Sequence, residues 1–316
     1  MSIPAHISAL VLDTTRCRCT RLKALTTAAA GLVTPDNVSS AAGDLLTAIC
    51  GIPNQKPLLV DCTGIVGLSN YALHGLHKFA DATHNTLSPL VFFNASEHLA
   101  EDIYRELPTR KEHPKSDKQI PQQTSSSKSV IYLPVGSRNI SVAPLIQQAE
   151  AVDRKRMQDI IRDTFHENAL GTPAPLSSTP FLASGVYNAR HIICEPDQFN
   201  WTVLHLEQHL DELIPDWDPS RHCLLSGSLR AAPFAAALAF MKTLPRAVEI
   251  HDHFGPNPIL LEEHDLGPSR HSLEYIYIGD FMIGGTELKI AYNWAAWRKC
   301  RLVKALVLGT LWEKKR

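Results

Sequence analysis

The first hundred residues carry short apolar runs that alternate with helical periodicity. Residues 58–60 and 90–93 predict buried strands, because these runs are short and rich in Leu, Val and Phe. A serine placed to cap a helix follows each run, Ser69 after the first and Ser96 after the second. Residues 130–135 predict a further strand of the same sheet. Strands that alternate with helices indicate a layered α/β unit.

The second half of the chain has a longer and more regular pattern. Apolar residues recur every three to five positions over residues 142–170 and along one face of residues 201–213, which predicts two helices. From Arg221 onward, predicted strands at 223–225, 247–250, 275–278 and 302–308 alternate with predicted helices at 231–241 and 287–298. Such alternation favours a mostly parallel sheet with helices on both faces.

A polar segment, residues 109–129, separates the two halves. It has no aromatic residue and one aliphatic residue, Ile120, so it cannot bury enough apolar surface to offset the entropy of ordering. We therefore expect a flexible linker or a long exposed loop between a smaller α/β domain at residues 1–108 and a second domain at residues 130–316. The strand at 130–135 fits either domain.

Composition excludes several classes of protein. A chain of 316 residues with 44% hydrophobic and 20% charged residues has the composition of a typical globular protein, which excludes disorder over its whole length. Lys and Arg number 31 against 32 Asp and Glu, so a net charge of −1 gives no general field for nucleic acid or lipid. One local basic cluster favours a solvated face, with a nucleic-acid contact as the open alternative: Arg298, Lys299, Arg301 and Lys304.

The sequence also indicates a compartment. No apolar run reaches the roughly 18–20 residues of a membrane span, and the N-terminus lacks the features of a secretory signal. Seven widely scattered cysteines, an odd number, favour reduced thiols over a disulfide framework. We therefore expect a cytoplasmic protein with no membrane partner.

The most informative motif is GDFMIGGT at residues 279–286, a predicted strand-to-helix turn. Asp280 places a carboxylate at the carboxyl end of the strand, where open α/β sheets bind their ligands. Gly284 and Gly285 are free to adopt positive φ, and Thr286 opens the helix. Backbone N–H groups at a helix N-terminus bind anions, and a neighbouring carboxylate accepts hydrogen bonds from hydroxyls. Together these groups suit a sugar phosphate.

Residues 181–308 resemble a type I phosphoribosyltransferase of the orotate phosphoribosyltransferase kind. The segment YIYIGDFMIGGTELKIA resembles that family's loop for phosphoribosyl pyrophosphate (PRPP), and LLSGSLRAAPFAAALA resembles its pyrophosphate loop and following helix. TPFLASGVYNARHIICEP is similar to the family's leading segment, and the polar residues 252–270 stand where the family has its flexible catalytic loop. The resemblance implies PRPP as ligand, with Mg²⁺ arriving through the substrate and no dedicated metal site in the protein.

The same resemblance implies roles for individual residues. Asp280 takes the second acidic position of the PRPP loop, and Arg230 would screen the leaving pyrophosphate, so these two are the implied catalytic residues. Substrate-binding roles are implied in the two loops for Ser228, Leu229, Ala231, Ile283, Gly284, Gly285 and Thr286. The chain departs from the family at Gly279, where the first acidic residue is missing, and in the flexible loop, where Arg270 is the one cation. The loop departure argues against orotate as the acceptor.

Residues 55–107 resemble a STAS-type domain, the fold of anti-sigma-factor antagonists. The segment LLVDCTGIVGLSNYALHGL stands where that family has a strand, a turn and a helix start. Asn70 occupies the position of the family's phosphoacceptor serine, so the resemblance does not extend to phosphorylation. It implies a STAS-like α/β domain through which the chain contacts a protein partner, and a small α/β packing or interaction domain without that ancestry is the open alternative.

Two further local patterns have structural explanations. His251, His253 and the run at 262–265 could be taken for metal ligands, but their spacing is better explained by a solvated loop. Trp294 and Trp297, three positions apart on a predicted helix, favour a place in the core over a platform for stacking bases.

Three functions remain open from the sequence. The first is an enzyme that transfers ribose 5-phosphate from PRPP to an unidentified acceptor. The second, favoured by Gly279, is a catalytically degenerate module that senses PRPP or a nucleotide for regulation. The third is a defence-system effector that acts on nucleotides or nucleic acid. The oligomeric state, a homodimer included, is open as well.

Overall fold

The computed structural model describes residues 11–23, 56–65, 67, 89–106, 128–132, 141–167, 173–175, 182–241, 247–250 and 273–310. The chain divides into two compact units, Met1–Arg156 and Met157–Arg316. The division falls inside helix α6 (Val142–Asp163), well after the expected linker. All but the last two residues of that linker lie outside the described residues, so its flexibility stays a prediction.

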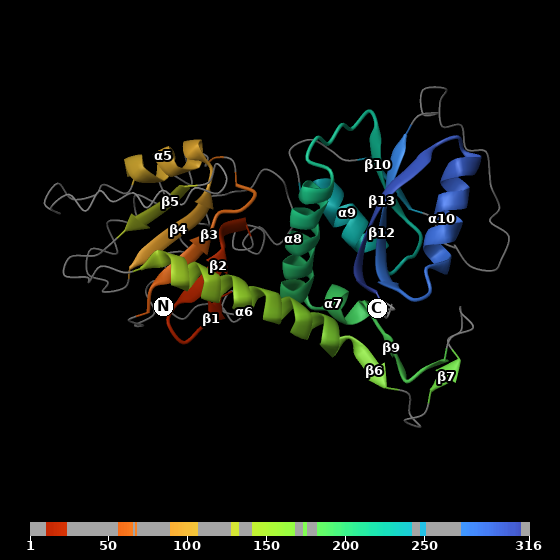
Figure 1. The fold of residues 1–316 in the computed structure, drawn as a ribbon, viewed down its shortest axis with the longest axis horizontal. Coiled ribbons are helices and arrows are strands. Elements are labelled where there is room, and N and C mark those ends of the chain that lie inside the picture. Colours follow the sequence, from red (N-terminus) through yellow and green to blue (C-terminus); the bar gives the residue numbers. More distant parts are fainter. Residues whose placement is uncertain are drawn as a thin grey trace, which may run out of the picture. The chain divides into compact units, whose positions relative to one another are not determined.

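Unit 1 is built on a five-stranded sheet in the order β1-β2-β3-β4-β5 (Figure 1). The strands are β1 (Leu12–Asp13), β2 (Arg18–Arg21), β3 (Leu58–Asp61), β4 (Leu90–Ala95) and β5 (Lys128–Tyr132). Strands β2, β3 and β4 are parallel, whereas β1 and β5 pair antiparallel with their neighbours at the edges. The strands predicted at 58–60 and 90–93 are confirmed, and the strand predicted at 130–135 pairs within this sheet.

Helix α5 (Glu97–Glu106) follows β4 because Ser96 caps it, as the sequence predicts: the backbone N–H of Leu99 donates to Ser96 Oγ at 3.2 Å. At the carboxyl end of β3, Asp61 accepts hydrogen bonds from Thr63 and Asn94. The α/β class of this unit is confirmed. The helix expected after Ser69 lies outside the described residues, and the STAS resemblance stays a prediction.

Unit 2 contains a four-stranded sheet in which every pairing is parallel, in the order β11-β10-β12-β13. The strands are β10 (His222–Ser226), β11 (Ala247–Ile250), β12 (Glu274–Met282) and β13 (Arg301–Thr310). The predicted parallel sheet is therefore confirmed. Strand β12 is longer than predicted, because its pairing with β13 continues to Met282, which lies opposite Thr310.

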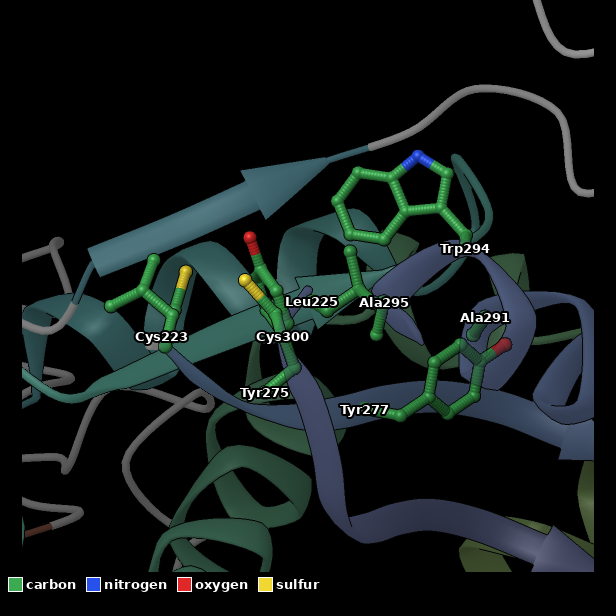
Figure 2. Close-up of a cluster of buried hydrophobic side chains, with 9 residues drawn as sticks. Cys223, Leu225, Tyr275, Tyr277, Ala291, Trp294, Ala295 and Cys300 are labelled. Carbon is green, nitrogen blue, oxygen red and sulfur yellow. The ribbon is translucent and has the colours of Figure 1, made fainter. Parts of the chain in front are cut away.

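Helices cover both faces of this sheet, as predicted (Figure 1). Helix α9 (Ala232–Phe240) packs on β10 and β11, and α8 (Pro196–Leu213) packs beside α9 and on β13. Helix α10 (Thr286–Trp297) packs on β12 and β13 from the other side. There Tyr275 meets the Trp294 ring edge-on, with centroids 5.4 Å apart, in the buried cluster that Figure 2 shows.

A smaller antiparallel element precedes the sheet. Strands β6 (Phe165–Glu167) and β9 (Gly185–Tyr187) pair, and β7 (Ala174–Pro175) pairs with β8 (Leu182–Ala183), before the short helix α7 (Arg190–Cys194). The helix expected over 142–170 instead ends at Asp163, where Thr164 turns back to donate its hydroxyl to the Ile161 carbonyl at 2.6 Å. None of the helices in the described part of the chain has the length and apolar character of a membrane span.

Candidate functional site

Asp280 lies at the carboxyl end of the parallel sheet in unit 2. Strand β10 stops at Ser226, which pairs with Ile278, so β12 extends past this neighbour and carries Asp280 beside the turn that follows β10. The Asp280 residue is only 5% exposed. A carboxylate in this position is unusual, because burial disfavours its ionised form unless a partner is present.

The partner is Arg230, which comes from the turn between β10 and α9. The turn is held by its own hydrogen bonds: Ser226 Oγ donates to the Ser228 carbonyl at 3.2 Å, and the Ala231 N–H donates to Ser228 Oγ at 3.1 Å. Arg230 Nε lies 3.4 Å from Asp280 Oδ2, while the Arg230 side chain is 55% exposed. The guanidinium therefore has room to contact a ligand as well as Asp280.

The turn after β12 has the backbone that the sequence predicts. Gly284 and Gly285 both adopt positive φ, 69° and 70°, which only glycine enters without strain. Gly285 is the N-cap of α10, and no side chain caps the helix. The N–H groups of the first helical turn, beginning at the exposed Thr286, therefore form an uncapped helix N-terminus of the kind that binds anions.

Two residues that sequence reasoning missed complete this end of the sheet. Glu287, in the first turn of α10, is half-buried, and the Tyr277 hydroxyl donates to its Oε2 at 3.3 Å. Glu287 also lies close enough to interact electrostatically with Asp280 and Arg230. The sequence offered only their spacing as a signal: Tyr277 precedes Asp280 by three residues on the strand, and Glu287 follows Gly285 by two.

Tyr277 also explains why residue 279 is glycine. Alternate residues of a strand face the same side, so Tyr277 and Gly279 both face α10. A Cβ added at Gly279 would lie 2.7 Å from Tyr277 Cε1 and 3.0 Å from Val307 Cγ1. The tyrosine ring thus fills the space that a carboxylate at residue 279 would need, and its hydroxyl leads to the carboxylate of Glu287 instead.

Burial sets the electrostatics of both carboxyl groups. It raises the pKa of Asp280 above its ordinary range, although Arg230 and the backbone N–H groups of Phe281 and Asp280 oppose the shift. The pKa of Glu287 is raised by burial and then by the negative charge of Asp280. Both carboxylates would therefore gain from hydroxyl donors or from added positive charge.

An aromatic pair borders the same strand end. Tyr187 of β9 stacks on Phe281 of β12 with ring centroids 4.7 Å apart and planes 28° from parallel, and Phe165 of β6 lies 5.0 Å from Tyr187. Phe281 directly follows Asp280. This contact joins the antiparallel element of unit 2 to the end of β12, which hydrophobic patterning alone did not predict.

The structure thus brings some predicted site residues together and leaves others undescribed. Arg230 and Asp280 meet, and Glu287 is near enough to interact electrostatically with both, whereas the loop at 251–272, with its histidines and Arg270, lies outside the described residues. Across the part of the chain that is described, no group of three or more His, Cys, Asp or Glu side chains is placed to hold a metal ion.

Comparison with known proteins finds solved structures that are only weakly similar to this chain. No model of a known protein family matches the sequence, and no curated protein matches it. One similar solved structure is adenine phosphoribosyltransferase from Saccharomyces cerevisiae complexed with D-2,5-dideoxy-2,5-imino-altritol 1,6-bisphosphate and adenine (15% identity, 50% of this chain, 89% of that chain, TM-score 0.36). Another is orotate phosphoribosyltransferase from Aeropyrum pernix (15% identity, 50% and 92%, TM-score 0.31). Similarities at these TM-scores do not assign the chain to a family.

Proposed function

We propose that unit 2 is a phosphoribosyltransferase-type domain that binds PRPP or a related nucleotide through its ribose 5-phosphate group and transfers that group to an acceptor. The observation that carries the proposal is the Arg230–Asp280 pair, 3.4 Å apart, at the strand end that leads into the Gly284–Gly285 turn. Cation, carboxylate and uncapped helix N-terminus match the three parts of such a ligand: diphosphate, ribose hydroxyls and 5′-phosphate.

The 5′-phosphate would bind where α10 begins. The two glycines have no side chains to obstruct an anion, and the helix dipole places partial positive charge at this end. Residues Ile283 to Thr286 would present backbone N–H groups, with the exposed Thr286 hydroxyl as a further donor. Ser228, Leu229 and Ala231 would form the wall opposite, because their turn carries Arg230.

The ribose hydroxyls would donate to Asp280 and Glu287. Each hydroxyl bonded to a buried carboxylate replaces solvation that burial has removed. The same two carboxylates fit Mg²⁺, which takes one or two protein carboxylates and fills its remaining positions with water and substrate phosphates. When bound, Mg²⁺ would screen the charge of the diphosphate, and Arg230 would add to that screening as the glycosidic bond opens.

One observation favours a second candidate, a sensor that binds the same ligand without catalysis. Gly279 cannot hold a carboxylate while the Tyr277 ring fills its space, so the carboxyl end of β12 presents only Asp280. In this alternative unit 1 would relay the bound state to a protein partner, which is the role that its STAS resemblance implies. Turnover of PRPP separates the two candidates.

Asp280→Asn is expected to weaken binding of ribose 5-phosphate, and Thr286→Ala to weaken it through the phosphate. Losing one hydrogen bond to a charged group costs about 1.5–3 kcal/mol, so calorimetry should show a loss of roughly tenfold or more for each variant. Tyr292→Phe, on the exposed side of α10, is the matched control. Unchanged affinity in both site variants would remove the basis of the proposal.

Loss of binding in Asp280→Asn should not come from unfolding. Because the pKa of Asp280 is raised in the folded chain, its ionised form is disfavoured there, and stability falls as pH rises through that pKa. An amide removes this penalty. Thermal melting at neutral pH should therefore show Asp280→Asn unfolding no earlier than the unsubstituted chain.

A further inference from the structure

The outer face of α10 carries exposed aromatic rings beside positive charge. Tyr292 and Trp297 are 59% and 57% exposed, although large aromatic side chains usually bury most of their surface. Lys289 on the same helix and Lys299 just after it are also exposed. We propose that this surface binds single-stranded nucleic acid; its residues, called the α10 face below, are Lys289, Tyr292, Asn293, Trp297 and Lys299.

Helical spacing places the exposed residues on one side of α10. Positions three and four apart lie next to each other, so Tyr292 and Asn293 adjoin Lys289, and Trp297 adjoins Asn293 one turn further on. The opposite side of the helix, with Trp294 at its centre, is buried against β12 in the cluster of Figure 2. The predicted place in the core is therefore confirmed for Trp294 and wrong for Trp297, which projects away from the sheet.

The charge of this region is complementary to phosphate. Residues 288–310 contain five Lys and Arg and no Asp or Glu, in a chain whose net charge is −1. The carboxylate that precedes this stretch, Glu287, accepts its hydrogen bond from Tyr277 at the buried side of the helix. A stretch of chain with exposed cations and no acidic residue attracts a polyanion, because each phosphate contact releases condensed counterions.

The basic cluster predicted from the sequence is split by the structure. Arg298 Cζ lies 4.8 Å from the Trp294 ring centroid, so this guanidinium stays with the buried side of the helix. Arg301 instead pairs with Glu274 at 3.7 Å. Lys304 lies opposite Ile276, so it shares the face of the sheet that points away from α10. Of the four, Lys299 alone therefore joins Lys289 in this surface.

Lys299 occupies a backbone position at which glycine would be the more stable residue. The Cys300 N–H donates to the Ala295 carbonyl and the Lys299 N–H to the Ala296 carbonyl, which is the Schellman ending of a helix. Lys299 therefore adopts positive φ, 57°, at a cost that glycine avoids. The helix dipole explains a cation near this end, but not a lysine at the one position where glycine is preferred.

The dimensions and chemistry favour a single strand over a duplex. From Lys289 to Lys299 the helix axis advances about 15 Å, enough for a few stacked bases at roughly 3.4 Å each. Exposed rings bind the faces of unpaired bases, and a duplex hides those faces in its own stack. Phosphates on either side of the stacked bases would then meet Lys289 and Lys299.

Fluorescence anisotropy of the full chain with labelled 12-mers tests this proposal. Single-stranded RNA and DNA of one sequence form two arms, and the duplex of that sequence forms the third. We expect both single strands to bind more tightly than the duplex, with log K falling against log salt at a slope of about −1.4, since two cations contribute about −0.7 each. Trp297→Ala should weaken binding by roughly fivefold or more through lost stacking.

Lys299→Gly is the sharpest variant, because it removes a charge while relieving the backbone. Its melting temperature should equal or exceed that of the unsubstituted chain, while its affinity falls and its salt slope flattens by about 0.7. Phe240→Ala, which removes an exposed ring from α9 on the other face of the sheet, is the matched control and should change nothing.

Three results would overturn the proposal. One is that no oligonucleotide binds. The second is binding that neither Trp297→Ala nor Lys299→Gly weakens, since the strand would then lie elsewhere. The third is self-association, measured by ultracentrifugation, that Trp297→Ala abolishes and oligonucleotide does not displace, which would make a second copy of the chain the occupant of the α10 face.

Discussion

Arg230→Ala is expected to slow the release of pyrophosphate from PRPP by about 10²-fold, the usual scale for losing one group that stabilises developing charge. Arg230 is the cation that the described residues place beside Asp280, and over half of its side chain is free to meet a diphosphate. The substitution leaves the Ser228–Ala231 turn intact, because backbone and serine groups make its hydrogen bonds. The measurement is pyrophosphate production with Mg²⁺ across a panel of nucleobases.

Arg221→Ala provides the matched control. Arg221 immediately precedes β10, and its exposed side chain pairs with Glu274 at 2.8 Å, at the opposite end of the same sheet from Arg230. Its removal should leave pyrophosphate production unchanged. If PRPP binds tightly to the unsubstituted chain but no base yields pyrophosphate above a blank with Mg²⁺ alone, the enzyme proposal fails and the sensor remains.

Gly279→Asp is expected to destabilise unit 2 by several kcal/mol instead of restoring a missing carboxylate. The new side chain would overlap Tyr277 and Val307, which costs about 1–3 kcal/mol for overpacking. A carboxylate on this buried face of β12 would add about 1–3 kcal/mol for an unsatisfied polar group. Urea unfolding of the full chain, followed through a signal of unit 2, measures the loss.

Two further variants make this prediction specific. Gly279→Ala should destabilise less, because it adds the clash without the charge. In the double variant Gly279→Asp/Tyr277→Ala the missing ring makes room, so the two substitutions should be non-additive by roughly 1 kcal/mol or more. Strict additivity would mean that Tyr277 does not occupy the space above residue 279.

Local patterns predicted most of the fold. The short apolar runs predicted β3 and β4. The alternation of strands with helices after Arg221 predicted a parallel sheet with helices on both faces. Gly284 and Gly285 take positive φ as expected, since consecutive glycines before a helix leave few other conformations. Each of these features depends on neighbours within a few residues, which a single sequence displays.

Features that depend on tertiary pairing were missed. The apolar run of β12 ends before Gly279, yet pairing with β13 extends the strand through Asp280. The long helix after residue 142 ends early because β6 pairs with β9, which is about twenty residues away in sequence. Trp297 follows Trp294 by three residues but falls outside the buried stripe, whose position is set by how α10 packs on the sheet.

The candidate site shows the same division. Asp280 and the glycine turn stand in one motif, so the sequence displays them together. Glu287 comes near them only because the first turn of α10 brings it to the Tyr277 hydroxyl of β12. From the sequence, Gly279 shows only that a carboxylate is missing at this position. In the structure the Tyr277 ring occupies the space that this carboxylate would need.

A crystal structure of the full chain with PRPP and Mg²⁺ tests the central claim most directly. We expect the 5′-phosphate on the backbone N–H groups at Gly284–Thr286, the ribose hydroxyls within hydrogen-bond distance of Asp280, and the diphosphate beside Arg230. PRPP bound elsewhere on the chain, or absent at saturating concentration while Gly284 and Gly285 keep their positive φ, would contradict the assignment of this strand end as a sugar-phosphate site.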